Sequence, residues 1–154
     1  MSDKIKNILF VCTGNSCRSI MAEAYTNKRI SEEKIDCLVS SCGTLALPGC
    51  APSQGARAVL AEDNIEAMGY VSKMISEEFI NWADLILVMQ ETHKDRIMSM
   101  IPHAGSKVKY LGSFGSEKHK EIPDPMGLGM EAYESCFKTL KDSVEGLIEW
   151  LKSQ

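Results

Sequence analysis

Apolar residues recur along this chain in two alternating patterns. Short, nearly continuous apolar runs predict strands at residues 5–11, 37–41, 84–89 and 107–111. Apolar residues spaced three or four apart predict helices at residues 19–30, 53–64, 77–82, 92–101 and 133–151. Because Leu85–Val88 contains no polar residue, we expect this strand to be covered on both faces, as in parallel sheets. Four strands alternating with helices predict an open α/β domain with its ligand cleft beyond the carboxyl ends of the strands.

Several helix starts carry capping signals. Ser53 and Ser76 each precede a helical pattern and can cap it. Thr92 and Asp95 resemble a capping box for the helix that ends before Pro102. We expect the stretch of residues 112–129 to be a long irregular loop.

Composition narrows the possible roles of the chain. It has 154 residues, 44% of them apolar, which suits one domain over residues 1–154. The formal net charge of -4 argues against a nucleic-acid partner, because such proteins neutralise phosphates with clustered Lys and Arg. The apolar run of residues 8–11 is too short for a signal peptide or a membrane span, so we expect a cytoplasmic protein without a membrane partner.

Six cysteines are spread over the chain, and its size and apolar content favour free thiols over a disulfide scaffold. Cys12 and Cys17 share one loop. Cys17 is interpreted as a packing residue or as the partner of Cys12 in a reversible disulfide, and both readings stay open. The other four cysteines are expected to be structural: Cys37, Cys42, Cys50 and Cys136.

The loop after the first predicted strand, residues 12–19, reads Cys-Thr-Gly-Asn-Ser-Cys-Arg-Ser. It leads from a strand into a helix, so its backbone N–H groups and the helix N-terminus can surround an anion such as phosphate. The same field favours the thiolate of Cys12, which makes Cys12 a candidate nucleophile. Arg18 has the planar, permanently charged group that can hold two phosphate oxygens at once.

Other residues of this loop fit supporting roles. Gly14 permits close backbone approach or a positive φ, and Asn15 tolerates left-handed geometry while its amide ties the loop together. Ser19 can donate a hydrogen bond to the sulfur of Cys12 and so assist its departure as a leaving group.

A phosphocysteine route also needs an acid for the leaving group and a base for water, and one carboxyl group can do both. Asp124 is the candidate, since Pro123 and Pro125 hold it in a stiff, extended turn. A Cys-x5-Arg pattern alone is common by chance, but the strand, the helix and the Asp-Pro turn together make it specific. No metal or cofactor is expected, because no histidine has metal-ligand spacing among His93, His103 and His119.

Residues 12–19 with the following Met21-Ala-Glu23 closely resemble the signature of low-molecular-weight protein tyrosine phosphatases of the bacterial type. Ser41-Cys-Gly-Thr44 is similar to the family's Ser-Ala-Gly-Thr, and Pro123-Asp-Pro125 falls where its general acid belongs. The resemblance implies a four-stranded parallel sheet flanked by helices on both faces and metal-free hydrolysis of phosphorylated proteins or peptides through a phosphocysteine. It implies that Ser41 supports the loop and that Met126 forms an apolar cleft wall. It also implies that phosphate or other oxyanions are bound by Thr13, Gly14, Asn15, Ser16, Cys17, Arg18 and Ser19.

The branches of this family leave alternatives open. The leading hypothesis is a phosphotyrosine phosphatase, and the nearest alternative is a protein arginine phosphatase, which the small Ser16 prompts. Ser16 also suggests a thiol-linked arsenate reductase, but residues 89–102 lack the two further cysteines of that branch. A binding module without turnover is a fourth hypothesis, because Ile20 replaces the usual proline and Tyr70 stands near the place of a loop-supporting histidine.

Overall fold

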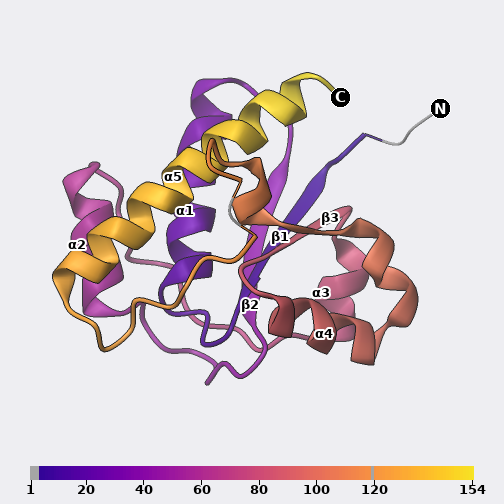
Figure 1. Ribbon diagram of the computed structural model, residues 1–154, viewed down its shortest axis with the longest axis horizontal. Helices are drawn as coiled ribbons and strands as arrows, with labels where there is room; N and C mark the ends of the chain where they lie inside the picture. The colour runs from indigo at the N-terminus through magenta and orange to yellow at the C-terminus, as the bar shows by residue number, and fades with distance from the viewer. Residues whose placement is uncertain (1–3, 119) are drawn as a thin grey trace.

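The computed structural model describes residues 4–118 and 120–154 and has the predicted α/β architecture (Figure 1). All four strands are parallel and lie in the order β2-β1-β3-β4. The strands are β1 (Asn7–Cys12), β2 (Leu38–Gly43), β3 (Leu85–Val88) and β4 (Val108–Tyr110). The helices are α1 (Arg18–Glu32), α2 (Gln54–Glu62), α3 (Glu77–Trp82), α4 (Glu91–Met100) and α5 (Met130–Lys152), with 3-10 turns η1 (Pro102–Lys107) and η2 (Leu111–Phe114).

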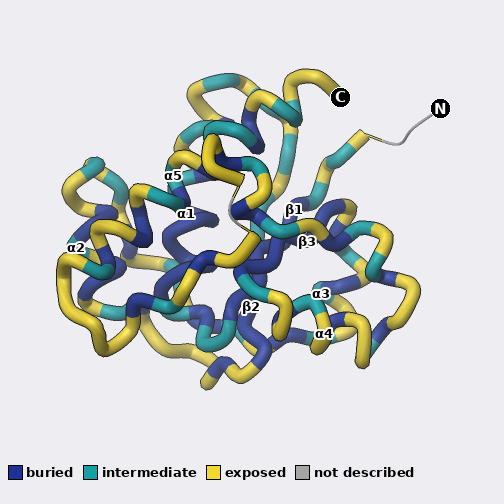
Figure 2. Tube along the Cα trace, viewed as in Figure 1, coloured by how far each residue is buried: buried dark blue, intermediate teal, exposed yellow. Residues whose placement is uncertain are grey.

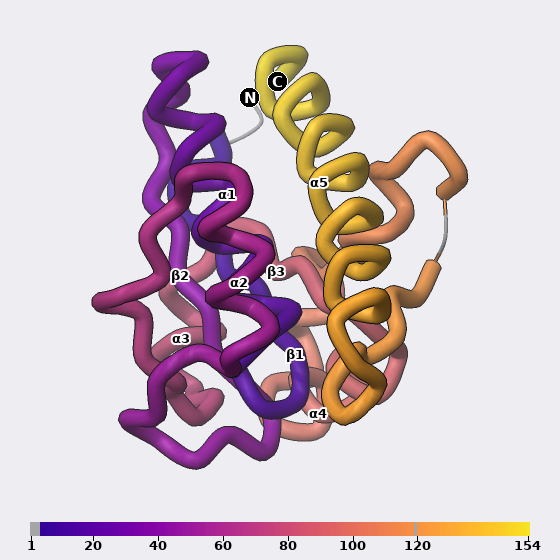
Figure 3. The backbone as a smooth tube through the Cα atoms, turned by 90° about the vertical axis from the view of Figure 1, so that its left-hand side faces the viewer, coloured from indigo at the N-terminus to yellow at the C-terminus, as the bar shows by residue number. Residues whose placement is uncertain are grey.

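The sheet separates two apolar clusters, one on each face. Ile8 and Phe10 of β1 point to the face that α1, α2 and α5 cover, while Leu9 and Val11 point to the face that α3 and α4 cover (Figures 1 and 3). This alternation follows from the two-residue period of a strand. The buried residues therefore concentrate along the sheet and the inner sides of the helices, as Figure 2 shows.

Two predicted caps are confirmed and one is wrong. The hydroxyl of Ser53 accepts the Ala56 N–H and that of Ser76 accepts the Phe79 N–H. Helix α4, however, begins at Glu91, so Thr92 lies inside its first turn and does not cap it. Gln90 is the N-cap residue instead.

The sequence pattern missed both 3-10 turns, because pieces this short have no apolar period of their own. All six cysteines are free thiols, and Cys42 and Cys136 are buried as expected of packing residues. Cys37 is half-buried and Cys50 is exposed. Within the described residues no helix is both long and apolar enough to cross a membrane.

Candidate active site

The loop of residues 12–19, hereafter the phosphate loop, connects β1 to α1 at the centre of the sheet. Cys12 is the last residue of β1 and Arg18 is the first residue of α1. Strand β1 pairs with β2 on one side and with β3 on the other. The loop therefore lies at the topological switch point, where the strand order reverses. Ligands of open α/β folds bind at such points.

The curvature of the phosphate loop depends on Asn15 and on a glycine outside the loop. Asn15 has a φ of 52°, the left-handed geometry that its sequence suggested. Gly14 is not in that region, and a Cβ there would meet only the Ser16 Oγ at 3.4 Å, so the positive-φ interpretation of Gly14 is wrong. Gly43, at the end of β2, is the close approach: a Cβ would lie 2.4 Å from the Thr13 carbonyl oxygen.

A chain of hydrogen bonds leads from the candidate nucleophile into the protein. Cys12 Sγ lies 2.9 Å from Ser19 Oγ, and the Asn15 amide donates to Ser19 Oγ at 2.7 Å and to Ser41 Oγ at 2.9 Å. Ser41 in turn donates to the carboxyl group of Glu23 at 2.5 Å. Burial raises the pKa of Glu23, partly offset by this hydrogen bond. These hydrogen bonds hold the Cys12 thiol and the left-handed backbone of Asn15 in one fixed arrangement.

Arg18 is almost completely buried, with 1% of its surface exposed. Its Nη1 donates to Gln90 Oε1 at 2.6 Å and to the Ile122 carbonyl at 2.9 Å. Its Nη2 donates to Thr13 Oγ1 at 3.4 Å and lies 3.7 Å from a carboxylate oxygen of Asp124. Among the described residues its Nε has no hydrogen-bond partner. A buried donor left unpaired is costly, so this N–H fits a site built to receive an acceptor such as an oxyanion.

Asp124 reaches the phosphate loop from a chain segment far away in sequence. One of its carboxylate oxygens accepts the Met126 backbone N–H at 3.0 Å and the Cys17 thiol at 3.4 Å. Burial, together with the nearby Cys12 and Asp124, raises the pKa of Cys17, so this thiol stays protonated and can donate. The Asp124 side chain remains 41% exposed and faces both Arg18 and solvent.

The structure thus brings Cys12, Arg18 and Asp124 together, as the sequence predicted. Sequence reasoning missed the surrounding supports, which are Glu23, Gln90 and His93. His93 is buried, and its Nε2 lies 2.9 Å from Thr13 Oγ1. Tyr70, proposed to stand near a loop-supporting position, instead accepts a hydrogen bond from Asn27. The sequence did contain a signal for Gln90. It is the first polar residue after the apolar run of residues 85–89, and β3 ends beside β1, where the site lies.

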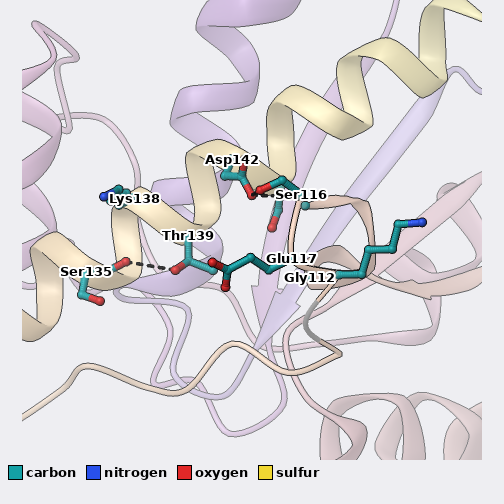
Figure 4. Close-up of a pocket in the computed structure, with 10 residues that line it drawn as sticks. Gly112, Ser116, Glu117, Ser135, Lys138, Thr139 and Asp142 are labelled. Atoms are coloured by element: carbon teal, nitrogen blue, oxygen red, sulfur yellow. Dashed lines mark hydrogen bonds between the residues drawn. The ribbon is translucent and has the colours of Figure 1, made fainter.

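Over residues 4–118 and 120–154, no group of three or more His, Cys, Asp or Glu side chains could hold a metal ion; His119 lies outside the described residues. A polar hollow of about 330 Å³ between α5 and residues 112–118 contains Asp142, bonded to Ser116 (Figure 4), but no phosphate-loop residue lines it.

Fold and site together define an α/β protein with a strand–loop–helix oxyanion site that carries a cysteine and an arginine. The family model described as low molecular weight phosphotyrosine protein phosphatase matches residues 7–154. The chain belongs to this family.

Relatives and solved structures agree with this assignment. The chain is 38% identical to a protein-arginine-phosphatase of Geobacillus stearothermophilus, over 96% of this chain and 97% of the relative. It is 32% identical to the low molecular weight protein-tyrosine-phosphatase Wzb of Escherichia coli, with the same coverage.

Two solved structures show the same fold. A mutant of the YwlE arginine phosphatase with a phosphorylated active site serine superposes with a TM-score of 0.89 at 34% identity, covering 95% of both chains. The tyrosine phosphatase Wzb from Escherichia coli in complex with sulphate gives a TM-score of 0.86 at 26% identity, covering 97% of this chain and 98% of Wzb.

Proposed function

We propose that this phosphatase removes the phosphoryl group from phosphorylated protein side chains through a phosphocysteine. The observation that carries the proposal is the convergence of three groups on one loop: Cys12 Sγ bonded to Ser19, the buried Arg18, and the Asp124 carboxylate 3.7 Å from the guanidinium. The sulphate bound by Wzb supports oxyanion binding in this fold.

In the first step the Cys12 thiolate attacks phosphorus while the phosphate loop amides and Arg18 hold the other phosphoryl oxygens. The S–P bond forms as the bond between phosphorus and the leaving group breaks. Asp124 gives its proton to the departing atom. Its partial exposure suits this task, because the leaving group must be able to exit to solvent.

In the second step a water molecule attacks phosphorus and Asp124 accepts the proton from it. The S–P bond breaks, phosphate leaves and Cys12 becomes a thiolate again. The Ser19 hydroxyl, 2.9 Å from Cys12 Sγ, donates to the sulfur and stabilises it as a leaving group. The neutral thiol of Cys17 and the Met126 N–H orient the Asp124 carboxylate.

Phosphotyrosine is the leading substrate residue. Exposed apolar side chains stand on two segments next to the phosphate loop, Leu45 and Leu47 on one side and Met126 and Leu128 on the other. The Leu45 N–H bonds to the Thr13 carbonyl, which ties the first segment to the loop. An aryl group could bury apolar surface between the two segments, with Met126 as a wall.

Phosphoarginine is the second candidate, and two observations favour it. The relative named a protein-arginine-phosphatase shares 38% identity with this chain, against 32% for the tyrosine phosphatase Wzb. Ser16, half-buried in the phosphate loop, is small and leaves room for a polar leaving group.

The test is steady hydrolysis of an aryl phosphate by the wild type and its loss in Cys12→Ser. Phosphotyrosine and phosphoarginine peptides of the same sequence would then be compared by kcat/KM. Persistent hydrolysis by Cys12→Ser would refute the phosphocysteine route. A much higher kcat/KM on the phosphoarginine peptide would replace the leading substrate with the second.

Two further points belong to the proposal. We place the protein in the cytoplasm, in keeping with its six free thiols, and we treat residues 1–154 as one phosphatase domain. Its partners would be phosphorylated proteins or peptides.

A further inference from the structure

His93 connects the first turn of α4 to the phosphate loop and takes no part in the mechanism described above. Only 1% of its surface is exposed. Its Nδ1 accepts the Gln90 backbone N–H at 3.1 Å, and its Nε2 lies 2.9 Å from Thr13 Oγ1. One imidazole therefore contacts both the cap of α4 and the second residue of the phosphate loop.

These contacts determine which ring nitrogen carries the proton. A backbone N–H can only donate, so Nδ1 of His93 must be the unprotonated nitrogen. Nε2 then carries the hydrogen and donates it to Thr13 Oγ1. Burial and the nearby positive charge of Arg18 lower the pKa of His93 to about 4, so the ring is neutral near pH 7.

The hydroxyl of Thr13 has two acceptor lone pairs and one proton. One lone pair accepts from His93 Nε2, and the other accepts from Arg18 Nη2 at 3.4 Å. With both lone pairs engaged, the remaining capacity of this hydroxyl is donation of its proton. Arg18 Nη2 and the unpaired Arg18 Nε belong to the same guanidinium, so the hydroxyl lies beside the donors that face an oxyanion.

We propose that His93 is a positioning residue that makes Thr13 a hydrogen-bond donor to the bound oxyanion. The imidazole fixes the direction of the Thr13 O–H bond, and Thr13 then contacts a phosphoryl oxygen next to Arg18. This inference deepens the proposed function, on whose oxyanion site it rests. It adds a side-chain donor to the backbone amides and the guanidinium.

The test compares His93→Gln with His93→Met, two side chains of similar length. Gln can accept the Gln90 N–H and donate to Thr13, whereas Met can do neither. The measurement is the dissociation constant of inorganic phosphate, by calorimetry or by NMR titration. We expect about a tenfold rise for His93→Met, as for loss of one hydrogen bond to a charged group, and less than threefold for His93→Gln.

A second variant separates positioning from a merely structural role. Thr13→Val removes the hydroxyl without touching α4 and should also weaken phosphate binding about tenfold. Adding His93→Met to Thr13→Val should cause no further loss, because the histidine acts through that hydroxyl. Equal losses from His93→Met in both backgrounds would overturn the proposal, as would unchanged phosphate affinity in Thr13→Val.

Phosphate binding needs no turnover, so the outcome is independent of the catalytic proposal. If the wild type hydrolyses phosphate esters and Thr13→Val binds phosphate as tightly as the wild type, only the proposed role of His93 is refuted. Absent hydrolysis, with tenfold weaker phosphate binding in Thr13→Val and no further loss when His93→Met is added, would refute the phosphatase mechanism and support the role of His93. If His93→Met does not fold, Thr13→Val still tests the proposal, because unchanged phosphate affinity in that variant would overturn it.

Discussion

The phosphate loop and the segment that carries Asp124 differ sharply in how they are held. The side chains of Asn15, Arg18 and Ser19 are almost fully buried. Ser19 bonds to Asn15 within the loop, and Asn15 and Arg18 bond to Ser41 and Gln90 outside it.

Residues 122–129, the acid loop, are mostly exposed or half-buried, with Ile122 and Pro125 as the buried exceptions. Asp124 is 41% exposed and Leu128 is 70% exposed.

This difference corresponds to two tasks within one reaction. A compact oxyanion is stabilised best by donors that are already in place, because the protein need not reorganise when charge develops. Protonating a leaving group requires access for side chains of different shape. A rigid phosphate loop beside an accessible acid loop can therefore combine strict phosphoryl chemistry with tolerance at the leaving group.

Among the variants that test this comparison, we expect Arg18→Lys to have the largest effect. Lysine keeps the charge but loses the planar fork and the simultaneous contacts to Gln90 and Ile122. We expect kcat/KM for an aryl phosphate to fall roughly 1000-fold, near the upper range for loss of one preorganised donor. A loss below about threefold would show that the phosphate loop is not preorganised around this side chain.

Asp124→Ala tests whether the acid loop supplies the proton for the leaving group. We expect kcat for substrates with a basic leaving group to fall roughly 100-fold, within the usual range for general acid catalysis. Good leaving groups should lose far less, because they depart without a proton. The measurement is a series of aryl phosphates that differ in the pKa of the phenol, and equal losses across it would reject Asp124 as the acid.

Gly43→Ala disturbs the phosphate loop without touching a reacting group. Its Cβ would lie 2.4 Å from the Thr13 carbonyl oxygen and 2.9 Å from the Asn15 backbone nitrogen, so the loop must shift. We expect roughly a tenfold loss of kcat/KM and a destabilisation of about 1–3 kcal/mol in denaturant unfolding. Gly105→Ala is the control, because its Cβ would meet only the flexible side chain of Met98.

The last prediction concerns stability in acid. The folded pKa of His93, about 4, lies below its unfolded value near 6.5, so the unfolded chain binds more protons between these values. Stability should therefore fall as pH drops from about 6.5 to 4, by on the order of 2 kcal/mol.

His93→Gln supplies the reference for this measurement, because glutamine does not titrate and the contribution of other groups cancels in the difference. The difference in unfolding free energy between the two proteins should shift against the wild type as pH drops from about 6.5, and become constant below about pH 4. A gap that does not change between pH 7 and pH 4 would contradict a neutral, buried His93.

Much of the fold could be predicted because its signals are local. The unbroken run Leu85–Val88 predicted a buried strand, and Ser76 predicted the start of α3 at Glu77, as the structure has them. The cap of α4 could not be predicted this way. Gln90 is not a favoured N-cap residue, and its side chain is directed to Arg18, 72 positions away.

The site residues also divide into those that local sequence could predict and those that it could not. Cys12 and Arg18 could be assigned because they share a short loop, and Asp124 because two prolines flank it. Glu23 and His93 could not be assigned, since their importance depends on which strands become neighbours. The pairing of β1 with β2 brings Ser41 to Asn15, and its pairing with β3 brings the start of α4 to Thr13. A one-dimensional pattern does not contain these contacts.

The hydrogen bonds of Arg18 have a consequence for the order of folding. Its partners, Gln90 and the Ile122 carbonyl, lie 72 and 104 positions further along the chain. Contacts of such long sequence separation close late, after the local helices. During refolding from denaturant, catalytic turnover should thus return later than far-ultraviolet circular dichroism, and a ribosome-bound chain that ends before Ile122 should be inert.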